Sequence, residues 1–104
     1  MKISPKELAD TLDTMVSQLE AGRNFDQAIL RVSEDQSHEL APEFAQMLGE
    51  IQAGSRRREA IQQMAERVKS PEFTLFVKAV INADETGKSI LEVVRAHAQQ
   101  LRAE

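Results

Sequence analysis

The fold is decided by three similar segments: Glu20-Ala-Gly22-Arg-Asn-Phe-Asp-Gln-Ala-Ile29, Gln52-Ala-Gly54-Ser-Arg-Arg-Arg-Glu-Ala-Ile61 and Glu85-Thr-Gly87-Lys-Ser-Ile-Leu-Glu-Val-Val94. In each segment a helix-like stretch ends at the glycine, and a second apolar face begins a few residues later. The glycines lie 32 and then 33 residues apart. Because a glycine costs a helix about 1 kcal/mol, we expect Gly22, Gly54 and Gly87 to be the left-handed residues that close three helices.

The composition is that of a small globular domain. With 104 residues, of which 41% are hydrophobic, the chain is expected to form one domain spanning residues 1–104. Cysteine is absent, which excludes disulfides and thiol chemistry. The net charge of −4 argues against a general nucleic-acid binder. No apolar run is long enough to cross a bilayer and the N-terminus lacks an apolar signal core, so we expect the chain by itself to be soluble.

Apolar residues recur at helical spacing along the whole chain, and strand-like alternation does not occur. The spacing predicts six helices, at about residues 5–21, 25–36, 42–53, 56–69, 71–86 and 90–103, with a polar loop or frayed turn at 33–40. The predicted fold is all-α, a compact six-helix bundle made of three antiparallel helical hairpins. A period near 33 is also typical of tetratricopeptide solenoids, whose Trp, Tyr and Pro signature positions are not filled here.

No motif in the sequence supports catalysis. The two histidines, His38 and His97, lack the helical spacing of a zinc protease, and we expect His97 to be a half-buried packing residue. The sequence also lacks a nucleophile elbow and a glycine-rich phosphate loop. We therefore predict that the chain is not an enzyme and that it needs no cofactor.

Charged residues are unevenly distributed, and this indicates where partners bind. No Lys or Arg occurs between Val32 and Ser55, and then Arg56, Arg57 and Arg58 follow directly. Arginines at a helix start are unfavourable for that helix's own dipole. We therefore predict that they form a docking patch for a partner's acidic surface or phosphates; an ordinary solvated face is the alternative. No aromatic residues lie among them, so single-stranded nucleic acid is not an expected ligand.

The residues Asp84 and Glu85 form a small acidic feature just before Gly87. Two carboxylates at the end of a helix oppose its dipole. They are candidates for a Ca²⁺ site completed by a partner chain, or they are simply exposed.

The ordered set of glycine hairpins resembles the F domain of type II secretion systems. The most specific stretch runs from Gly54 to Arg102 and contains Gly54-Ser-Arg-Arg-Arg-Glu-Ala-Ile-Gln-Gln-Met-Ala-Glu-Arg67 and Phe76-Val-Lys-Ala-Val-Ile-Asn-Ala-Asp-Glu-Thr-Gly87. The similarity extends from about Leu8 to Arg102 and is strongest to platform proteins of the tight-adherence (Flp) pilus system, of the TadC type.

The resemblance implies a six-helix domain on the cytoplasmic side of a bacterial inner-membrane protein without catalytic activity. It implies contacts with an assembly ATPase, with other platform proteins and with copies of itself, which couple the ATPase to pilin movement. Because this sequence lacks membrane helices, we expect the membrane link to lie in flanking segments of a longer parent protein. The resemblance also implies Ca²⁺ binding near the turn at Asp84 and Glu85 in some members.

Two other functions remain open. One is a soluble helical adaptor that binds a peptide or a protein, and the other is a nucleic-acid or cyclic-nucleotide binder that acts through Arg56, Arg57 and Arg58. Flanking membrane segments or neighbouring pilus genes would favour the platform over the adaptor. A steep salt dependence of nucleotide binding would favour the nucleic-acid or cyclic-nucleotide binder.

Overall fold

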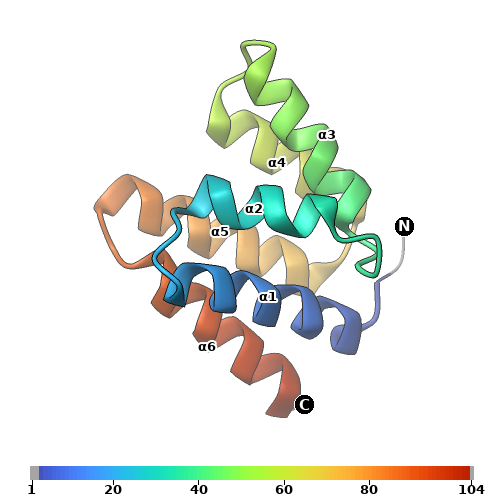
Figure 1. The fold of residues 1–104 in the computed structure, drawn as a ribbon, viewed down its shortest axis with the longest axis vertical. Helices are drawn as coiled ribbons and strands as arrows, with labels where there is room; N and C mark the ends of the chain where they lie inside the picture. The colour runs from blue at the N-terminus through green and yellow to red at the C-terminus, as the bar shows by residue number, and fades with distance from the viewer. Residues whose placement is uncertain (1–2, 104) are drawn as a thin grey trace.

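The computed structural model describes residues 3–103 as six α-helices joined by short turns (Figure 1). The helices are α1 (Pro5–Glu20), α2 (Phe25–Glu34), α3 (Ala41–Gln52), α4 (Arg57–Val68), α5 (Pro71–Thr86) and α6 (Ile90–Ala103). No strand occurs among residues 3–103, so the prediction of an all-α, six-helix fold is confirmed. The boundaries differ most at α2, which ends at Glu34, so Ser33 and Glu34 are helical and not part of the predicted loop.

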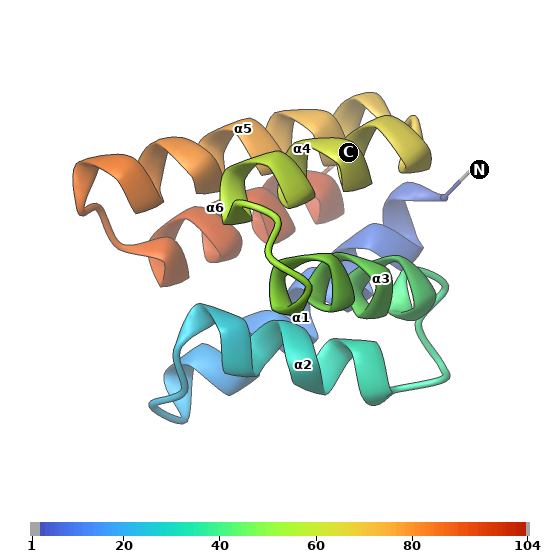
Figure 2. The same cartoon turned by 90° about the horizontal axis from the view of Figure 1, so that it is seen from above.

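Each helix packs against the next one in the chain, and α6 returns to pack against α1. Viewed from above, α1, α2 and α3 form one layer and α4, α5 and α6 form the other (Figure 2). The molecule measures 38 × 31 × 22 Å. In a solenoid the first and last helices lie at opposite ends, so the direct contact of α1 with α6 excludes the tetratricopeptide-like alternative.

The three glycines close helices as predicted. Their φ angles are +91° at Gly22, +111° at Gly54 and +74° at Gly87, all in the region that L side chains avoid. In each case the following residue donates its backbone N–H to a carbonyl five positions earlier, as in Ser55 to Glu50 at 2.9 Å. This hydrogen bond is the mark of a Schellman C-cap, and it turns the chain back to start the next helix.

Side chains also cap most helix starts. Asn24 and Gln27 form a reciprocal capping box at α2, with hydrogen bonds of 2.8 and 2.9 Å. The hydroxyls of Ser4, Ser70 and Ser89 each accept the backbone N–H three residues ahead. By contrast, the residue before α4 is Arg56, and it makes no side-chain cap. The start of α4 therefore lacks the side-chain cap that Ser4, Asn24, Ser70 and Ser89 give to other helices.

One apolar core runs between the two layers. Phe73 on α5 is fully buried, and its ring centre lies 6.2 Å from that of Phe44 on α3 in an edge-to-face arrangement. The centre of the Phe76 ring lies 6.0 Å from that of Phe73. The largest fully buried side chains come from every helix and from the α2–α3 loop: Leu8, Leu12, Met15, Ile29, Val32, Leu40, Phe44, Met47, Val68, Phe73, Val80 and Val94.

Ion pairs line the outer edge of the contact between α1 and α6. Arg95 lies 2.8 Å from Glu20, and Arg102 lies 2.9 Å from Asp10 and also pairs with Asp13. These groups are about half exposed, so water and salt screen each pair and its contribution to stability is small. Burial of the apolar faces is therefore the main force that closes the ring of helices, and the ion pairs align the two helices along their length. None of the helices within residues 3–103 has the length and apolar character needed to cross a lipid bilayer.

Candidate protein-interaction site

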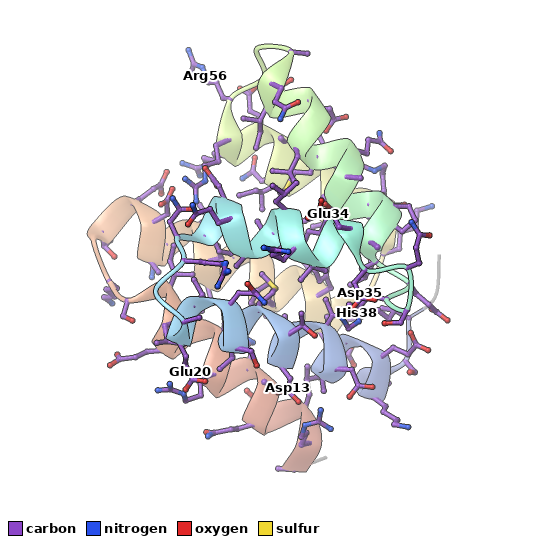
Figure 3. The ribbon with its side chains drawn as sticks, in the orientation of Figure 1. Asp13, Glu20, Glu34, Asp35, His38 and Arg56 are labelled. Carbon is purple, nitrogen blue, oxygen red and sulfur yellow. The ribbon has the colours of Figure 1, made fainter. Side chains whose placement is uncertain are left out.

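The three arginines lie at the turn between α3 and α4, directly after Gly54, but they do not form a uniform patch. Arg56 is the N-cap residue, and Arg57 and Arg58 are the first two residues of α4. Figure 3 shows Arg56 pointing away from the body of the protein at this turn. Its side chain makes no ion pair with any of residues 3–103, whereas the side chains of Arg57 and Arg58 both do.

Arg57 joins three helices. Its Nη2 atom lies 3.3 Å from Asp26 Oδ1 on α2 and 3.9 Å from Asp84 Oδ1 on α5. Its guanidinium carbon lies 5.3 Å from the centre of the Phe25 ring, within the range of a cation–π interaction. About a third of the Arg57 side chain is exposed, so these contacts are only partly screened by water.

Arg58 pairs with the other predicted acidic residue. Its Nη1 atom lies 2.7 Å from Glu85 Oε2, between two side chains that are both more than half exposed. The two features that the sequence analysis treated separately, the arginines and the Asp84-Glu85 pair, therefore lie together. We call Asp26, Arg57, Arg58, Asp84 and Glu85 the charged junction.

Helix dipoles explain why these charges gather here. The N-terminus of α4 carries partial positive charge and the C-terminus of α5 carries partial negative charge. Arginines at the start of α4 and carboxylates at the end of α5 are each unfavourable for their own helix. Because the ion pairs bring the two ends together, Arg57 and Arg58 stabilise the end of α5, and Asp84 and Glu85 stabilise the uncapped start of α4.

The charged junction borders a small hollow between α4 and α5 whose floor is apolar. Its lining consists of Arg57, Arg58, Ile61, Val80, Ile81, Asp84 and Glu85. Charged groups of both signs around an apolar floor are suited to contact with a protein surface and give no reactive centre.

The donor set at the charged junction does not fit Ca²⁺. This ion takes six to eight oxygen ligands, and here three carboxylates face two guanidinium groups, at 2.7, 3.3 and 3.9 Å. A cation at this place would be repelled by Arg57 and Arg58. Over residues 3–103 no group of three or more potential ligands is arranged to hold a metal ion.

His38 anchors the α2–α3 loop to α1. Its Nε2 atom lies 2.9 Å from Thr14 Oγ1 and 3.4 Å from Asp35 Oδ2, and its Nδ1 atom lies 3.4 Å from Thr11 Oγ1. Only 10% of the His38 side chain is exposed, and Figure 3 shows Asp35 and His38 together in this loop. Hydrogen bonds from the hydroxyl and backbone N–H of Ser37 lower the pKa of Asp35. These contacts of His38 hold the α2–α3 loop against α1.

His97 is half-buried on α6, in agreement with the prediction. Its ring centre lies 5.7 Å from that of Phe76 in an edge-to-face arrangement. Burial lowers the pKa of His97, because the charged imidazolium loses hydration there. The side chain therefore serves in packing between α5 and α6.

The sequence analysis missed Asp26 and the two exposed leucines, Leu30 and Leu75. Asp26 shows no signal in the sequence, because its partner Arg57 lies 31 residues away on another hairpin. The leucines did carry a signal, since both are apolar residues outside the apolar stripe of their own helix.

Comparison with known proteins identifies the family. Residues 11–104 match the family model for Type II secretion system (T2SS), protein F. No curated protein and no solved structure shows significant similarity to the chain. The family match covers both the glycine hairpins and the charged junction, and we conclude that the chain belongs to the type II secretion system protein F family.

Proposed function

We propose that this chain is the cytoplasmic scaffold of an inner-membrane platform protein of the TadC type in a tight-adherence (Flp) pilus system. In this role it couples an assembly ATPase to pilin movement by protein–protein contacts, and it associates with other platform proteins and with copies of itself. Its link to the membrane lies in segments of a longer parent protein.

The family supports the general part of this proposal. Its members are non-enzymatic membrane platform proteins of secretion systems. The closed ring of helices, with α6 packed on α1, is suited to transmitting force, because a closely packed core moves as a body. The polar outer faces of the helices are then available to partners.

The observation that carries the specific part is the environment of Arg56. Its guanidinium is exposed, has no ion-pair partner among residues 3–103, and lies on a turn held by Gly54 and by the charged junction. Because the turn already fixes the backbone at Arg56, only the side chain has to be ordered when it binds a carboxylate. In this proposal Arg56 makes the first contact with an acidic surface of the ATPase, and Arg57 and Arg58 form the wall of the contact site.

The test compares two charge reversals. Arg56→Glu is expected to abolish pull-down of the assembly ATPase and to stop pilus assembly. Lys88→Glu, the matched control, makes the same charge change on the exposed turn between α5 and α6. It is expected to leave both readouts unchanged. Circular dichroism is used to verify that both variants remain helical.

Arg57 and Arg58 need separate treatment, because their replacement also removes ion pairs within the chain. Arg58→Lys keeps the charge at that site and is expected to keep ATPase binding. If Arg56→Glu binds the ATPase as well as the unaltered chain does, the role of Arg56 is wrong. If neither this chain nor its full-length parent binds any assembly ATPase, the coupling function itself is wrong.

A further inference from the structure

The ion pair between Arg58 and Glu85 is unusually exposed. The Arg58 side chain is 60% exposed and that of Glu85 is 51% exposed. The pair of Arg67 with Glu43 has the same separation of 2.7 Å, but its side chains are only 26% and 21% exposed. Among the ion-paired arginines of residues 3–103, Arg58 has the most exposed side chain. Because water and salt screen an exposed pair, little free energy holds Arg58 on Glu85.

The pair can also open without disturbing its surroundings. Within residues 3–103, Arg58 and Glu85 form ion pairs only with each other. Arg57, by contrast, holds two carboxylates and the ring of Phe25. Glu85 lies in the last turn of α5, where its negative charge is unfavourable for the helix dipole. Loss of the Arg58–Glu85 pair therefore leaves Arg57 in place as the link between α2, α4 and α5.

The carboxylates of the charged junction cancel the positive charge of the turn between α3 and α4. The junction contains two arginines and three carboxylates, and Arg56 adds a third positive charge next to it. The formal charges of these six groups sum to zero. An acidic partner is attracted less strongly while all three carboxylates stay beside the arginines.

We propose that Glu85 is an internal competitor: its carboxylate occupies Arg58 until a carboxylate of an acidic partner takes its place. The inference rests on the function proposed above, in which the partner is the assembly ATPase, and it adds the regulation of that site. Arg56 makes the first contact, and Arg58 lies two positions further along the start of α4. Arg58 then exchanges one carboxylate for another, and Glu85 is released into water.

The exchange also defines the chemistry of the partner surface. A single carboxylate can bind Arg56 but cannot at the same time replace Glu85. A surface with two neighbouring carboxylates can bind Arg56 and Arg58 together, and it gains from both contacts. The turn therefore favours partners with clustered acidic residues.

The competition is tested on this chain without the ATPase. A fluorescent hexaglutamate peptide supplies neighbouring carboxylates, and fluorescence anisotropy at physiological ionic strength measures its binding. Glu85→Gln is expected to bind the peptide about fivefold more tightly than the unaltered chain, because Arg58 no longer has a competing carboxylate. Circular dichroism is used to verify that the variant remains helical.

Glu59→Gln is the matched control. Glu59 is exposed, follows Arg58 directly on α4 and pairs with no arginine among residues 3–103. The substitution removes the same charge from the same region but releases no arginine. It is expected to change peptide binding by about twofold at most, because salt screens charges that are not in contact.

A double substitution tests the role of Arg58. In the Arg58→Ala variant, Glu85→Gln is expected to give no gain in peptide binding, because no cation is left to release. The inference is overturned if Glu85→Gln binds hexaglutamate no more tightly than Glu59→Gln does, or if the gain persists in Arg58→Ala.

Pull-down of the ATPase is a separate measurement, so the two failures can be distinguished. If Arg56→Glu abolishes the pull-down while Glu85→Gln leaves peptide binding unchanged, the competition is wrong and the proposed function stands. If Glu85→Gln tightens peptide binding through Arg58 but no ATPase binds to the chain or its parent, the competition stands and the coupling function is wrong.

Discussion

The guanidinium group of Arg57 lies 3.3 Å from the carboxylate of Asp26, which joins the start of α4 to the start of α2. These residues belong to different hairpins and lie on different layers of the bundle (Figure 2). The same guanidinium group also reaches Asp84 on α5 and the ring of Phe25. One arginine at an uncapped helix start therefore connects three helices.

Arg57→Ala is expected to lower the free energy of unfolding more than Arg58→Ala does. Arg57 loses two ion pairs and a cation–π contact, together worth about 1 kcal/mol. Arg58 loses one highly exposed pair, worth about 0.5 kcal/mol or less. Urea unfolding followed by circular dichroism measures both losses. High salt should narrow the gap because it screens the ion pairs, and equal losses at low salt would contradict the central position of Arg57.

Gly54→Ala and Gly49→Ala are expected to change stability in opposite directions. Gly54 has φ +111°, so an alanine there is strained by about 1–2 kcal/mol. Gly49 lies within α3 and a Cβ at that position meets no atom within 4 Å, so alanine stabilises the helix by about 0.5–1 kcal/mol. Thermal unfolding of the two variants provides the comparison. A stabilising Gly54→Ala would show that this glycine does not need its left-handed conformation.

Phe73→Ala is expected to lower the free energy of unfolding by about 3–5 kcal/mol, because it removes a fully buried ring that packs against Phe44 and Phe76 and leaves a cavity. Leu75→Ala, two residues along the same helix, is the matched control. Its side chain is 61% exposed, so its effect on the free energy of unfolding should stay within about 0.5 kcal/mol. Chemical denaturation of dilute protein separates the two, and similar losses would mean that α5 is rotated relative to this structure.

His97 is expected to make the fold less stable as the pH falls. Burial lowers its pKa in the folded state below the ordinary value of 6.5, so the unfolded chain binds a proton more tightly. The stability that neutral His97 provides is complete above pH 6.5 and decreases as the pH falls toward the folded-state pKa. NMR titration of the two histidine ring signals measures this directly. His97→Gln should flatten the stability profile in that range; an unchanged profile would assign the pH effect to other groups.

The helices and their caps could be predicted from the sequence because their determinants are local. The boundaries of α5 and α6 agree with the expected ones, and Gly22, Gly54 and Gly87 all have positive φ. At α2 the prediction extended the helix too far, because nothing in the sequence shows that His38 holds the following loop against α1. The exposure of Leu30 and Leu75 could also have been predicted, because both lie outside the apolar stripe of their own helix.

The candidate site could be predicted only in part. Arg56, Arg57 and Arg58 were recognisable as charges that do not suit the start of a helix. Their individual roles were not, because the ion pairs of Arg57 and Arg58 depend on where α2 and α5 lie in space.

The sequence by itself determined six amphipathic helices, three glycine-closed hairpins and an unusual run of arginines. The hydrogen bonds of helices and caps join residues that are only a few positions apart, so their pattern can be found along the chain. The tertiary structure alone decided that α6 returns to α1, where Arg102 meets Asp10 across 92 positions. It also decided that Arg57 and Arg58 have ion-pair partners whereas Arg56 has none among residues 3–103. Such contacts depend on how all six apolar faces fill one core together, and no single segment of the chain specifies that arrangement.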